Sequence, residues 1–301
     1  MKRWLKFGAY GVLGIVALAG IALVVGVQLG ERKMQRHIEV AVAPVALRTD
    51  PASVERGRYL FMSRGCTECH GTNGAGKVFI DDGKGMYVRA PNITPGPGSV
   101  VARYGPGDWT RTIRHGVKPD GRPAIIMPSE DYARFTDDDL ASLVAFLRQM
   151  PAVAGPGADI HFPIPVKVMY AAGLITDAAE KIDHTLAPST PVAESVTAAH
   201  GAYVANACIG CHGAHFSGGK IPGTPPDWPP AANLTPGEGS ALARYPDAQA
   251  FTAMLRTGKR PDGSAVSPVM PFTAFKELND IDDQALFAFL KQLPPRPAGQ
   301  R

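Results

Sequence analysis

Cysteine is scarce in this sequence, and so are blocks of like charge and the motifs of common enzyme families. Only four cysteines occur among 301 residues. The formal net charge of +4 is too small to indicate a nucleic-acid-binding protein. Neither a glycine-rich nucleotide motif nor a nucleophile elbow is present. Nucleic-acid binding and nucleotide chemistry are therefore not expected, and the four cysteines become the informative residues.

All four cysteines lie in two copies of one pattern, C-x-x-C-H, which is the attachment signature of c-type haem. Two thiols three positions apart reach the two vinyl groups on one edge of a porphyrin, and the histidine supplies a nitrogen to the iron. A four-cysteine zinc site, the alternative, would leave both histidines unexplained. We therefore predict two covalently bound haem c groups, with no cysteine left for a disulfide. The attachment residues are Cys66, Cys69 and His70 in the first copy, and Cys208, Cys211 and His212 in the second.

Residues 7–30 form an apolar run of 30 − 7 + 1 = 24 residues, in which Gln28 is the only strongly polar side chain. A helix of this length measures about 36 Å, enough for the ~30 Å hydrocarbon core of a bilayer. A cleaved signal peptide has a shorter apolar core, of about 7–15 residues, and a small-residue cleavage site. Here the charged residues 31–33 follow instead. We expect an uncleaved membrane anchor, with a cleaved signal as the alternative.

The flanks of this run do not decide its orientation, because three Lys/Arg residues precede it and three follow it closely. Covalent haem attachment takes place outside the bacterial cytoplasm. We therefore expect a single span in the inner (cytoplasmic) membrane with the haem domains in the periplasm.

The chain repeats itself at an almost constant offset. The two haem motifs differ by 208 − 66 = 142 positions, two Asn-x-Thr-Pro stretches by 233 − 92 = 141 and two Met-Pro pairs by 270 − 127 = 143. Two homologous domains with one haem each are the simplest account. We predict an anchor with its flanks at 1–36, a tether at 37–50, domains at 51–152 and 196–295, an interdomain segment at 153–195 and a tail at 296–301.

Both repeats show the same helical outline, so the predicted fold class is all-α and loop-rich, with little strand signal. A short helix leads into each haem motif, near 51–64 and 196–207. A middle helix begins near 107 and 247, and a closing helix follows Thr136 and, in the second copy, Asp280. Thr136 is a typical N-cap, and apolar residues at 140, 143, 144 and 147 share one helix face. The apolar patch 166–175 is unlike a flexible linker, and we expect it to lie across the domain interface.

A low-spin electron-transfer haem needs a second axial ligand, and methionine sulfur is a soft donor that favours ferrous iron. Met127 lies 127 − 70 = 57 residues after His70, and Met270 lies 270 − 212 = 58 residues after His212. Each precedes a proline, which restricts the backbone of the ligand. We predict that Met127 binds the first iron and Met270 the second, each opposite its histidine.

A bis-histidine site is the alternative, but no other histidine or methionine is duplicated in a matching place. Repeated Arg-Tyr pairs at 103–104 and 244–245 either bond haem propionates or combine a surface arginine with a core tyrosine. For Asn92 and Asn233 a role in turns is favoured over one at a propionate. The unduplicated residues are Met62, Met86, Met150, Met254, His115, His161, His184, His200 and His215.

These motifs together resemble tandem class I cytochrome c domains. The similarity covers about 52–152 and 196–294 and rests on A-P-N-I-T-P, P-D-G, M-P and D-D-D-L beside the haem motifs. It is nearest to the cytochrome c subunits of bacterial membrane-bound alcohol, gluconate and nicotinate-type dehydrogenases. The resemblance implies His/Met ligation of both irons and electron transfer from a partner dehydrogenase toward quinone or a terminal oxidase. The alcohol and gluconate dehydrogenase subunits carry three haems, whereas two motifs occur here.

We therefore expect an electron-transfer protein or subunit rather than an enzyme, with no small-molecule substrate of its own. One alternative is the dihaem subunit of a haem-copper terminal oxidase. A dihaem peroxidase and a ligand-sensing module would both need an iron that opens, and the duplicated methionines count against this.

Overall fold

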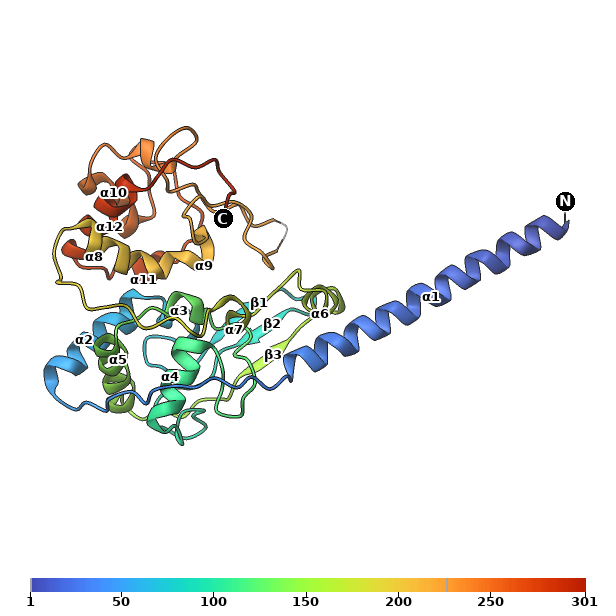
Figure 1. Ribbon diagram of the computed structural model, residues 1–301, viewed down its shortest axis with the longest axis horizontal. Helices are drawn as coiled ribbons and strands as arrows, with labels where there is room; N and C mark the ends of the chain where they lie inside the picture. Colours follow the sequence, from blue (N-terminus) through green and yellow to red (C-terminus); the bar gives the residue numbers. More distant parts are fainter. Residues whose placement is uncertain (1, 226) are drawn as a thin grey trace.

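The computed structural model describes residues 2–225 and 227–301. Met1, at the start of the predicted anchor segment, and Pro226, in the second predicted domain, lie outside the described residues. A long helix projects from a body of two lobes, the first built from the earlier half of the chain and the second from the later half (Figure 1). The described residues are mostly helical with few strands, as predicted.

Helix α1 spans Lys2–Met34 and contains the whole apolar run predicted from the sequence. Its part Lys6–Met34 is long and apolar enough to cross a membrane. The hydrophobic side chains stand away from the rest of the protein, with Phe7 72% and Ile15 69% exposed. Such a surface suits lipid, because water would solvate it poorly.

The predicted tether, residues 37–50, is extended but is held against the first lobe. The amide of Ile38 donates to the carbonyl of Gly121 at 2.8 Å, and that of Val45 donates to Pro106 at 3.2 Å. Val45 is buried among the core residues of the first lobe. The base of α1 is therefore tied to this lobe by ordered chain.

The first lobe contains the helices predicted for the first repeat. Asp50 caps the helix that leads into the haem motif, accepting from the Ser53 amide at 2.9 Å. Thr136 caps the closing helix and accepts from the Asp139 amide at 3.0 Å, as predicted. The elements are α2 (Pro51–Ser63), α3 (Cys66–His70), α4 (Pro106–His115), the 3-10 turn η1 (Ser129–Asp131) and α5 (Asp137–Gln149).

The second lobe repeats this order with small changes. Asp247 caps the middle helix and accepts from the Ala250 amide at 2.8 Å. Asn279 caps the closing helix and accepts from the Asp282 amide at 2.8 Å. The elements are α8 (Ala198–Val204), η2 (Ala205–Cys208), α9 (Ile209–His212), η3 (Ala241–Arg244), α10 (Ala248–Thr257), α11 (Phe272–Phe275) and α12 (Asp280–Gln292).

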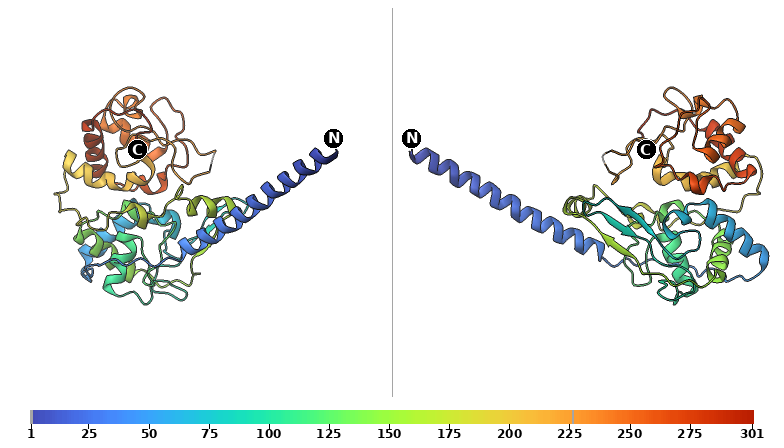
Figure 2. Two further views of the ribbon diagram at one scale, coloured as in Figure 1. Left: turned by 45° about the vertical axis from the view of Figure 1, so that its right-hand side comes forward. Right: turned by 180° about the vertical axis from the view of Figure 1, so that it is seen from behind.

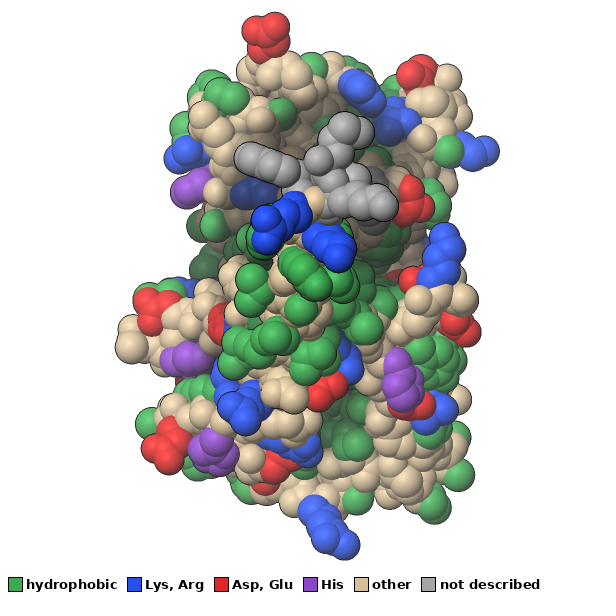
Figure 3. Space-filling view, turned by 90° about the vertical axis from the view of Figure 1, so that its right-hand side faces the viewer, with side chains coloured by type: hydrophobic (Ala, Val, Ile, Leu, Met, Phe, Trp, Pro, Cys, Tyr) green, Lys and Arg blue, Asp and Glu red, His purple; other side chains and the backbone are tan. Residues whose placement is uncertain are grey.

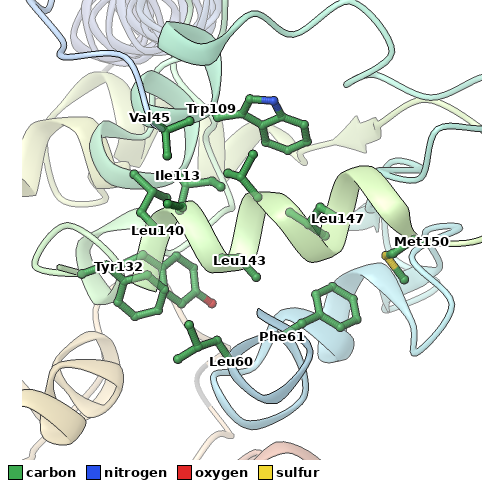
Figure 4. Close-up of a cluster of buried hydrophobic side chains, with 13 residues drawn as sticks. Val45, Leu60, Phe61, Trp109, Ile113, Tyr132, Leu140, Leu143, Leu147 and Met150 are labelled. Atoms are coloured by element: carbon green, nitrogen blue, oxygen red, sulfur yellow. The ribbon is translucent and has the colours of Figure 1, made fainter. Parts of the chain in front are cut away.

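Each lobe is centred on a close crossing of its leading and closing helices. A methyl group on Gly57 of α2 would lie 1.9 Å from the carbonyl oxygen of Ser142 in α5, and one on Gly201 of α8 would lie 1.9 Å from that of Ala285 in α12. Only glycine allows the backbones to approach this closely. The buried core of the first lobe gathers around its crossing, as Figure 4 shows for Leu60, Phe61, Leu140, Leu143 and Leu147.

A small antiparallel sheet is the main departure from the predicted fold. Its strands are β1 (Val78–Asp81), β2 (Tyr87–Arg89) and β3 (Asp159–His161), in the order β1-β2-β3. The central strand buries Val88. The third strand comes from the interdomain segment, so this segment begins as part of the first lobe.

Our expectation that the apolar patch 166–175 crosses the interface between the lobes is wrong for all but its last residue, Ile175, which lies against Gly223 of the second lobe. The patch forms most of α6 (Ile164–Ala171) and the turn after it, and α6 packs against the base of α1. The next helix, α7 (Ala178–Lys181), lies on the first lobe, with Lys181 Nζ 2.6 Å from Glu130. The reason is that the base of α1 offers an apolar surface, whereas the lobes meet largely through polar groups.

Candidate haem-binding sites

The first haem motif is a single turn of helix, α3. Positions i, i+3 and i+4 of a helix share one face, so Cys66, Cys69 and His70 point to the same side. A glycine residue with a positive φ lies at each end of this turn, Gly65 at +85° before it and Gly71 at +73° after it. Such left-handed conformations are costly for other residues, so the two glycines let the chain enter and leave the short helix abruptly.

The second motif is divided between two short elements. Cys208 ends η2, and Cys211 and His212 lie in α9. Gly213 follows with a φ of +78°, as Gly71 does in the first lobe. The two cysteines and the histidine again occupy one face of a helical turn.

Both motif histidines are held by a backbone carbonyl. The Nδ1 atom of His70 lies 3.0 Å from the oxygen of Pro91, and that of His212 lies 2.9 Å from the oxygen of Ala232. Burial lowers the pKa of both rings, so they stay neutral. A neutral ring that donates from Nδ1 carries its lone pair on Nε2. Each histidine is thus prepared to bind iron through Nε2, in the way that carbonyl partners fix metal-binding histidines.

The four cysteines form no disulfide in the structure. Burial raises the pKa of the Cys66 thiol to about 12, with Cys69 adding to the effect, and burial also raises that of Cys208 to about 12. These positions disfavour the thiolates that zinc would need. They suit neutral sulfur, which is what a thioether bond to haem provides. Among the described residues, no group of three or more His, Cys, Asp and Glu side chains could hold a metal ion.

The two predicted methionine ligands lie on loops that lead into short helical turns, Met127 before η1 and Met270 before α11. Met127 is half-buried against the core of the first lobe, and Met270 is half-buried against that of the second. The carbonyl of each methionine accepts from the amide two residues later, at 2.8 Å in both lobes. The two loops therefore have the same local structure. Binding of iron by Met127 and Met270 stays a prediction.

The competing residues have other partners. Met62 and Met254 pack in the two cores. The sulfur of Met150 lies against Gly74. Paired histidines His115 and His184 bring their Nδ1 atoms within 3.0 Å of each other.

The repeated asparagines act in turns, as favoured above. The side-chain oxygen of Asn92 accepts from the Thr94 amide at 2.8 Å, and that of Asn233 accepts from the Thr235 amide at 2.9 Å. Both asparagines are buried. The repeated arginines are exposed beside packed tyrosines, which agrees with the second of the two interpretations offered for the Arg-Tyr pairs.

Each haem motif contacts the methionine loop of the other lobe, by which we mean the predicted methionine ligand and the short helical turn after it, 127–131 or 270–275. These contacts were not predicted from the sequence. The amide of Gly210, inside the second motif, donates to Asp131 at 2.8 Å, four residues after Met127. In return, the hydroxyl of Thr273, three residues after Met270, donates to Glu68 inside the first motif. Gly210 and Glu68 are corresponding positions of the two haem motifs (210 − 68 = 142), and Thr273 lies one position before the counterpart of Asp131, since the methionines differ by 143. The two contacts are therefore similar contacts made in opposite directions.

A buried ionic cluster supports the same interface. Arg64, two residues before the first motif, places Nη2 2.5 Å from Asp282 of the second lobe. His200 donates from Nε2 to the same carboxylate at 2.7 Å. Burial alone would raise the pKa of Asp282, but Arg64 and the hydrogen bonds hold it below its ordinary value. A buried charge with this many partners fixes the relative position of the lobes, because removing one partner leaves another charge uncompensated.

These residues fit covalently bound haem. The chemistry of the donor set is complete on the histidine side, where each ring is partly buried, neutral and oriented. The cysteine pairs share a helix face with the histidine, and a methionine loop of matching local structure accompanies each motif. The role of Arg64 and Asp282 at the interface was not predicted from the sequence, because no local pattern marks these residues. The same holds for Tyr59, which donates to Asp282, and for Asp139, which accepts from Tyr203 of the second lobe.

The comparisons with known proteins agree with this geometry. The sequence model of the cytochrome c family matches residues 54–151 and 196–294. The fructose dehydrogenase cytochrome subunit of Gluconobacter japonicus is 26% identical over 273 residues, which are 81% of this chain and 53% of the relative. The cytochrome c subunit of the alcohol dehydrogenase (quinone) of Gluconobacter oxydans is 27% identical over 282 residues, 83% of this chain and 57% of the relative.

A diheme cytochrome c-type protein of Cereibacter sphaeroides is 28% identical over 165 residues, which cover 50% of this chain and 54% of that protein. The chain spans a little over half the length of these curated relatives.

Proposed function

The chain belongs to the cytochrome c family, and from this premise we propose that it is a membrane-anchored, periplasmic two-haem electron carrier that serves a partner dehydrogenase. The relatives are named as cytochrome subunits of fructose and alcohol dehydrogenases. The chain is accordingly an electron-transfer component and not the catalytic enzyme.

Two covalently bound haem c groups, one in each lobe, are its cofactors. When bound, haem c supplies an iron that takes up and releases one electron. The cysteine pairs would hold it through thioether bonds, and His70 and His212 would supply Nε2 to the irons. We propose Met127 and Met270 as the sulfur ligands on the opposite side. A histidine and a methionine at each iron would leave no open position for peroxide or a gaseous ligand.

The observation that carries this proposal is the reciprocal contact between each haem motif and the methionine loop of the other lobe. It brings α3 against α11, as seen between the lobes in Figure 1, and α9 against η1. Electron tunnelling slows steeply with distance, so two attachment sites at one interface favour transfer between them. We therefore propose a relay, in which one haem accepts an electron and the other delivers it.

The predicted boundaries become part of this proposal. We propose an anchor at 1–36, a tether at 37–50, domains at 51–152 and 196–295, the joining segment at 153–195 and a tail at 296–301. The anchor would keep both haems near the inner membrane, where quinone and terminal oxidases accept electrons. We propose that electrons pass from the dehydrogenase to the haems and then to quinone or a terminal oxidase.

The alternative partner is a haem-copper oxidase. It is supported by a match of 29% identity over 119 residues, 38% of this chain, to a Cbb3-type cytochrome c oxidase subunit of Helicobacter pylori. The longer matches to dehydrogenase subunits favour the dehydrogenase.

Purification of the full-length protein from its native membranes in mild detergent tests the partner. We expect a catalytic dehydrogenase chain to copurify, and its substrate to reduce both haems of the complex. Copurification of haem-copper oxidase subunits would instead show that the partner is a terminal oxidase. Carbon monoxide tests the carrier role separately, since rapid stoichiometric binding to either reduced haem would contradict it.

A further inference from the structure

Helix α6 lies across the base of α1 and touches it closely. A methyl group on Gly26 would lie 3.2 Å from the Val168 side chain, and one on Gly30 would lie 2.3 Å from the carbonyl oxygen of Lys167. The two glycines are four positions apart and so lie on one face of α1. They allow α6 to approach this face of α1 at backbone distance.

Charged residues fix this crossing. Lys167 of α6 pairs with Glu31 of α1 at 2.7 Å. Lys33 donates to the carbonyl of Tyr170 at 2.9 Å, and Arg36 pairs with the buried Asp177 at 2.8 Å. Several partly buried pairs at one crossing form a network, which holds geometry better than an isolated surface pair does. The helix α6 is thus rigidly placed relative to α1.

The two helices cross at a large angle. In Figure 1, α1 runs along the page whereas α6 is seen nearly end-on, and Figure 2 shows α6 lengthwise after rotation. If α1 crosses a bilayer, α6 therefore lies close to the plane of the membrane.

The position of α6 along α1 coincides with the expected edge of the bilayer. The part of α1 before the crossing, residues 7–25, contains 25 − 7 + 1 = 19 residues. It measures about 29 Å, close to the ~30 Å thickness of the hydrocarbon core. The bilayer would end where α6 begins to cover α1.

The face of α6 turned away from the protein is apolar. Pro165, Met169 and Ala172 recur at i, i+4 and i+7 and are all exposed, with Met169 38% exposed. Ile164 at the start of the helix is 51% exposed, and Leu174 in the turn after it is 66% exposed. Because α6 packs against α1, this surface lies beside the exposed apolar side chains of α1. Figure 3 shows hydrophobic side chains, those of α1 among them, in the middle of the face from which α1 projects.

We propose that α6 and the turn through Leu174 form an interfacial helix that lies in the headgroup region of the bilayer. The occupant of this apolar surface is lipid, because the surface continues that of the span and lies at the depth where the span ends. Burial of apolar side chains in the interface is favourable in proportion to their area. The inference rests on the proposed membrane anchor and adds that the haem lobes are held in one orientation to the membrane.

Single cysteines in the full-length, haem-loaded protein test the proposal. All native cysteines are used for haem, so an introduced cysteine is the only free thiol. Met169→Cys and Leu174→Cys are compared with Ile15→Cys in the middle of the span. The aqueous control is Val196→Cys, which is 52% exposed and precedes α8, the helix that Figure 1 shows on the side remote from α1. Each variant is reconstituted in vesicles of phosphatidylethanolamine and phosphatidylglycerol at about one chain per vesicle and treated with a water-soluble maleimide.

Thiols in lipid remain protonated and react slowly, since the thiolate is the nucleophile. We expect the cysteines at 169 and 174 to react at least about tenfold more slowly than the one at 196. Equal rates at 174 and 196, with the cysteine at 15 protected, would overturn the interfacial helix while leaving the anchor intact. Loss of residue 15 from the mature protein, or rapid labelling there, would instead show that the anchor proposal fails. Protection at 169 and 174 that appears only at many chains per vesicle would assign the surface to a second copy and overturn the lipid contact.

A second measurement reports on orientation. Leu174→Glu should reduce the linear dichroism of the haem absorption bands in oriented multilayers, because the haem orientations would spread. The matched change Leu186→Glu, at an exposed residue of the joining segment, should not. An unchanged dichroism for Leu174→Glu would contradict the proposal that the lipid contact of α6 and its following turn holds the haem lobes in one orientation.

Discussion

The hydroxyl of Tyr59 donates a hydrogen bond of 2.6 Å to Asp282, which lies in the other lobe. Tyr203 donates at 2.6 Å to Asp139 in the opposite direction. Since 203 − 59 = 144 and 282 − 139 = 143, these are corresponding residues of the two repeats. Burial raises the pKa of Tyr59 to about 12, so the hydroxyl stays a donor at ordinary pH. Each lobe thus donates one charge-assisted hydrogen bond from its tyrosine to the aspartate of the other lobe.

Removal of these hydroxyls should loosen the interface and leave both lobes folded. A hydrogen bond to a charged group contributes about 1.5–3 kcal/mol. We expect Tyr59→Phe and Tyr203→Phe each to lower the free energy of unfolding by that order, and the double variant to slow electron transfer between the haems. Chemical unfolding and flash-induced kinetics measure the two effects. Tyr87→Phe is the control, because this ring lies beside His161 in the small sheet. An unchanged inter-haem rate in the double variant would contradict the relay.

Loss of either methionine ligand should change one haem only. Met127→Ala and Met270→Ala leave the cysteines intact, so both haems should remain covalently attached. We expect each variant to lose about half of the sulfur-to-iron charge-transfer band of the oxidised protein, and the affected haem to fall in potential. Spectroscopy and redox titration measure these changes.

The matched control for the methionine variants is Met86→Ala, in the segment between β1 and β2. It should leave the band and both potentials unchanged. A full band in either Met127→Ala or Met270→Ala would show that the ligand had been assigned wrongly.

Asp283 should make the second lobe less stable at neutral pH than in weak acid. Burial raises its pKa from the ordinary 3.8 to about 7, although Arg256 opposes this. Between these two pKa values the folded state binds a proton that the unfolded state has released, so stability falls as pH rises from about 4 to about 7. Asp283→Asn keeps the shape and removes the charge. We expect its melting temperature at pH 8 to exceed that of the parent, with a flatter profile down to pH 5.

The corresponding position in the first repeat is 283 − 143 = 140, which is the buried Leu140. This chain therefore already uses an uncharged residue at the same place in its other lobe. A melting temperature of Asp283→Asn that still falls as steeply as the parent's between pH 5 and pH 8 would assign the pH dependence to another group. Asp131, whose pKa burial also raises, is the next to test.

The two glycines at the helix crossings, Gly57 and Gly201, should not tolerate replacement by a residue with a side chain. Gly57→Ala would place a methyl group against the carbonyl of Ser142, and overpacking of a core costs typically about 1–3 kcal/mol. We expect a loss of stability of at least this order in the first lobe, measured by thermal unfolding. Gly157→Ala is the control, because a methyl group there meets nothing within 4 Å. Equal stabilities of the two variants would mean that α2 and α5 separate easily.

The anchor should remain on the mature protein. Intact mass or N-terminal sequencing of the purified native protein decides this. The expected mature chain retains residues 7–30, whereas a mature start beyond about residue 20 would show that the run is a cleaved signal.

Local features of the chain made most of the haem-binding architecture predictable. The haem motifs, the Thr136 cap and the apolar faces of the closing helices all depend on residues within a few positions of one another. The methionine loops were predicted because duplication made Met127 and Met270 correspond at equal distances from their histidines. The structure gives the two loops matching backbone bonds and leaves iron binding to experiment.

The missed features depend on residues far apart in the chain. Tyr59 and Asp282 are 223 positions apart, so no local pattern connects them. The strands are too short to show alternation, and β2 finds its partner β3 only when the joining segment folds back. The apolar patch was recognised as buried surface, but hydrophobicity is not directional and cannot say which surface will cover it. Val168 and Tyr170 belong to the contact with α1, and substitutions there should change the anchoring of the lobes rather than their interface.

The exchanged contacts between the lobes have the form of an isologous interface, in which each half presents the same patch to the other. Such an interface does not require the two halves to be joined. A single-repeat protein carrying these tyrosines and aspartates would pair with a copy of itself through the same four residues. Fusion of two copies then removes the dependence of pairing on concentration, and it frees each half to diverge, as Arg56 and His200 have done at corresponding positions (200 − 56 = 144). In the fused chain, one half can become specialised for the donor and the other for the acceptor.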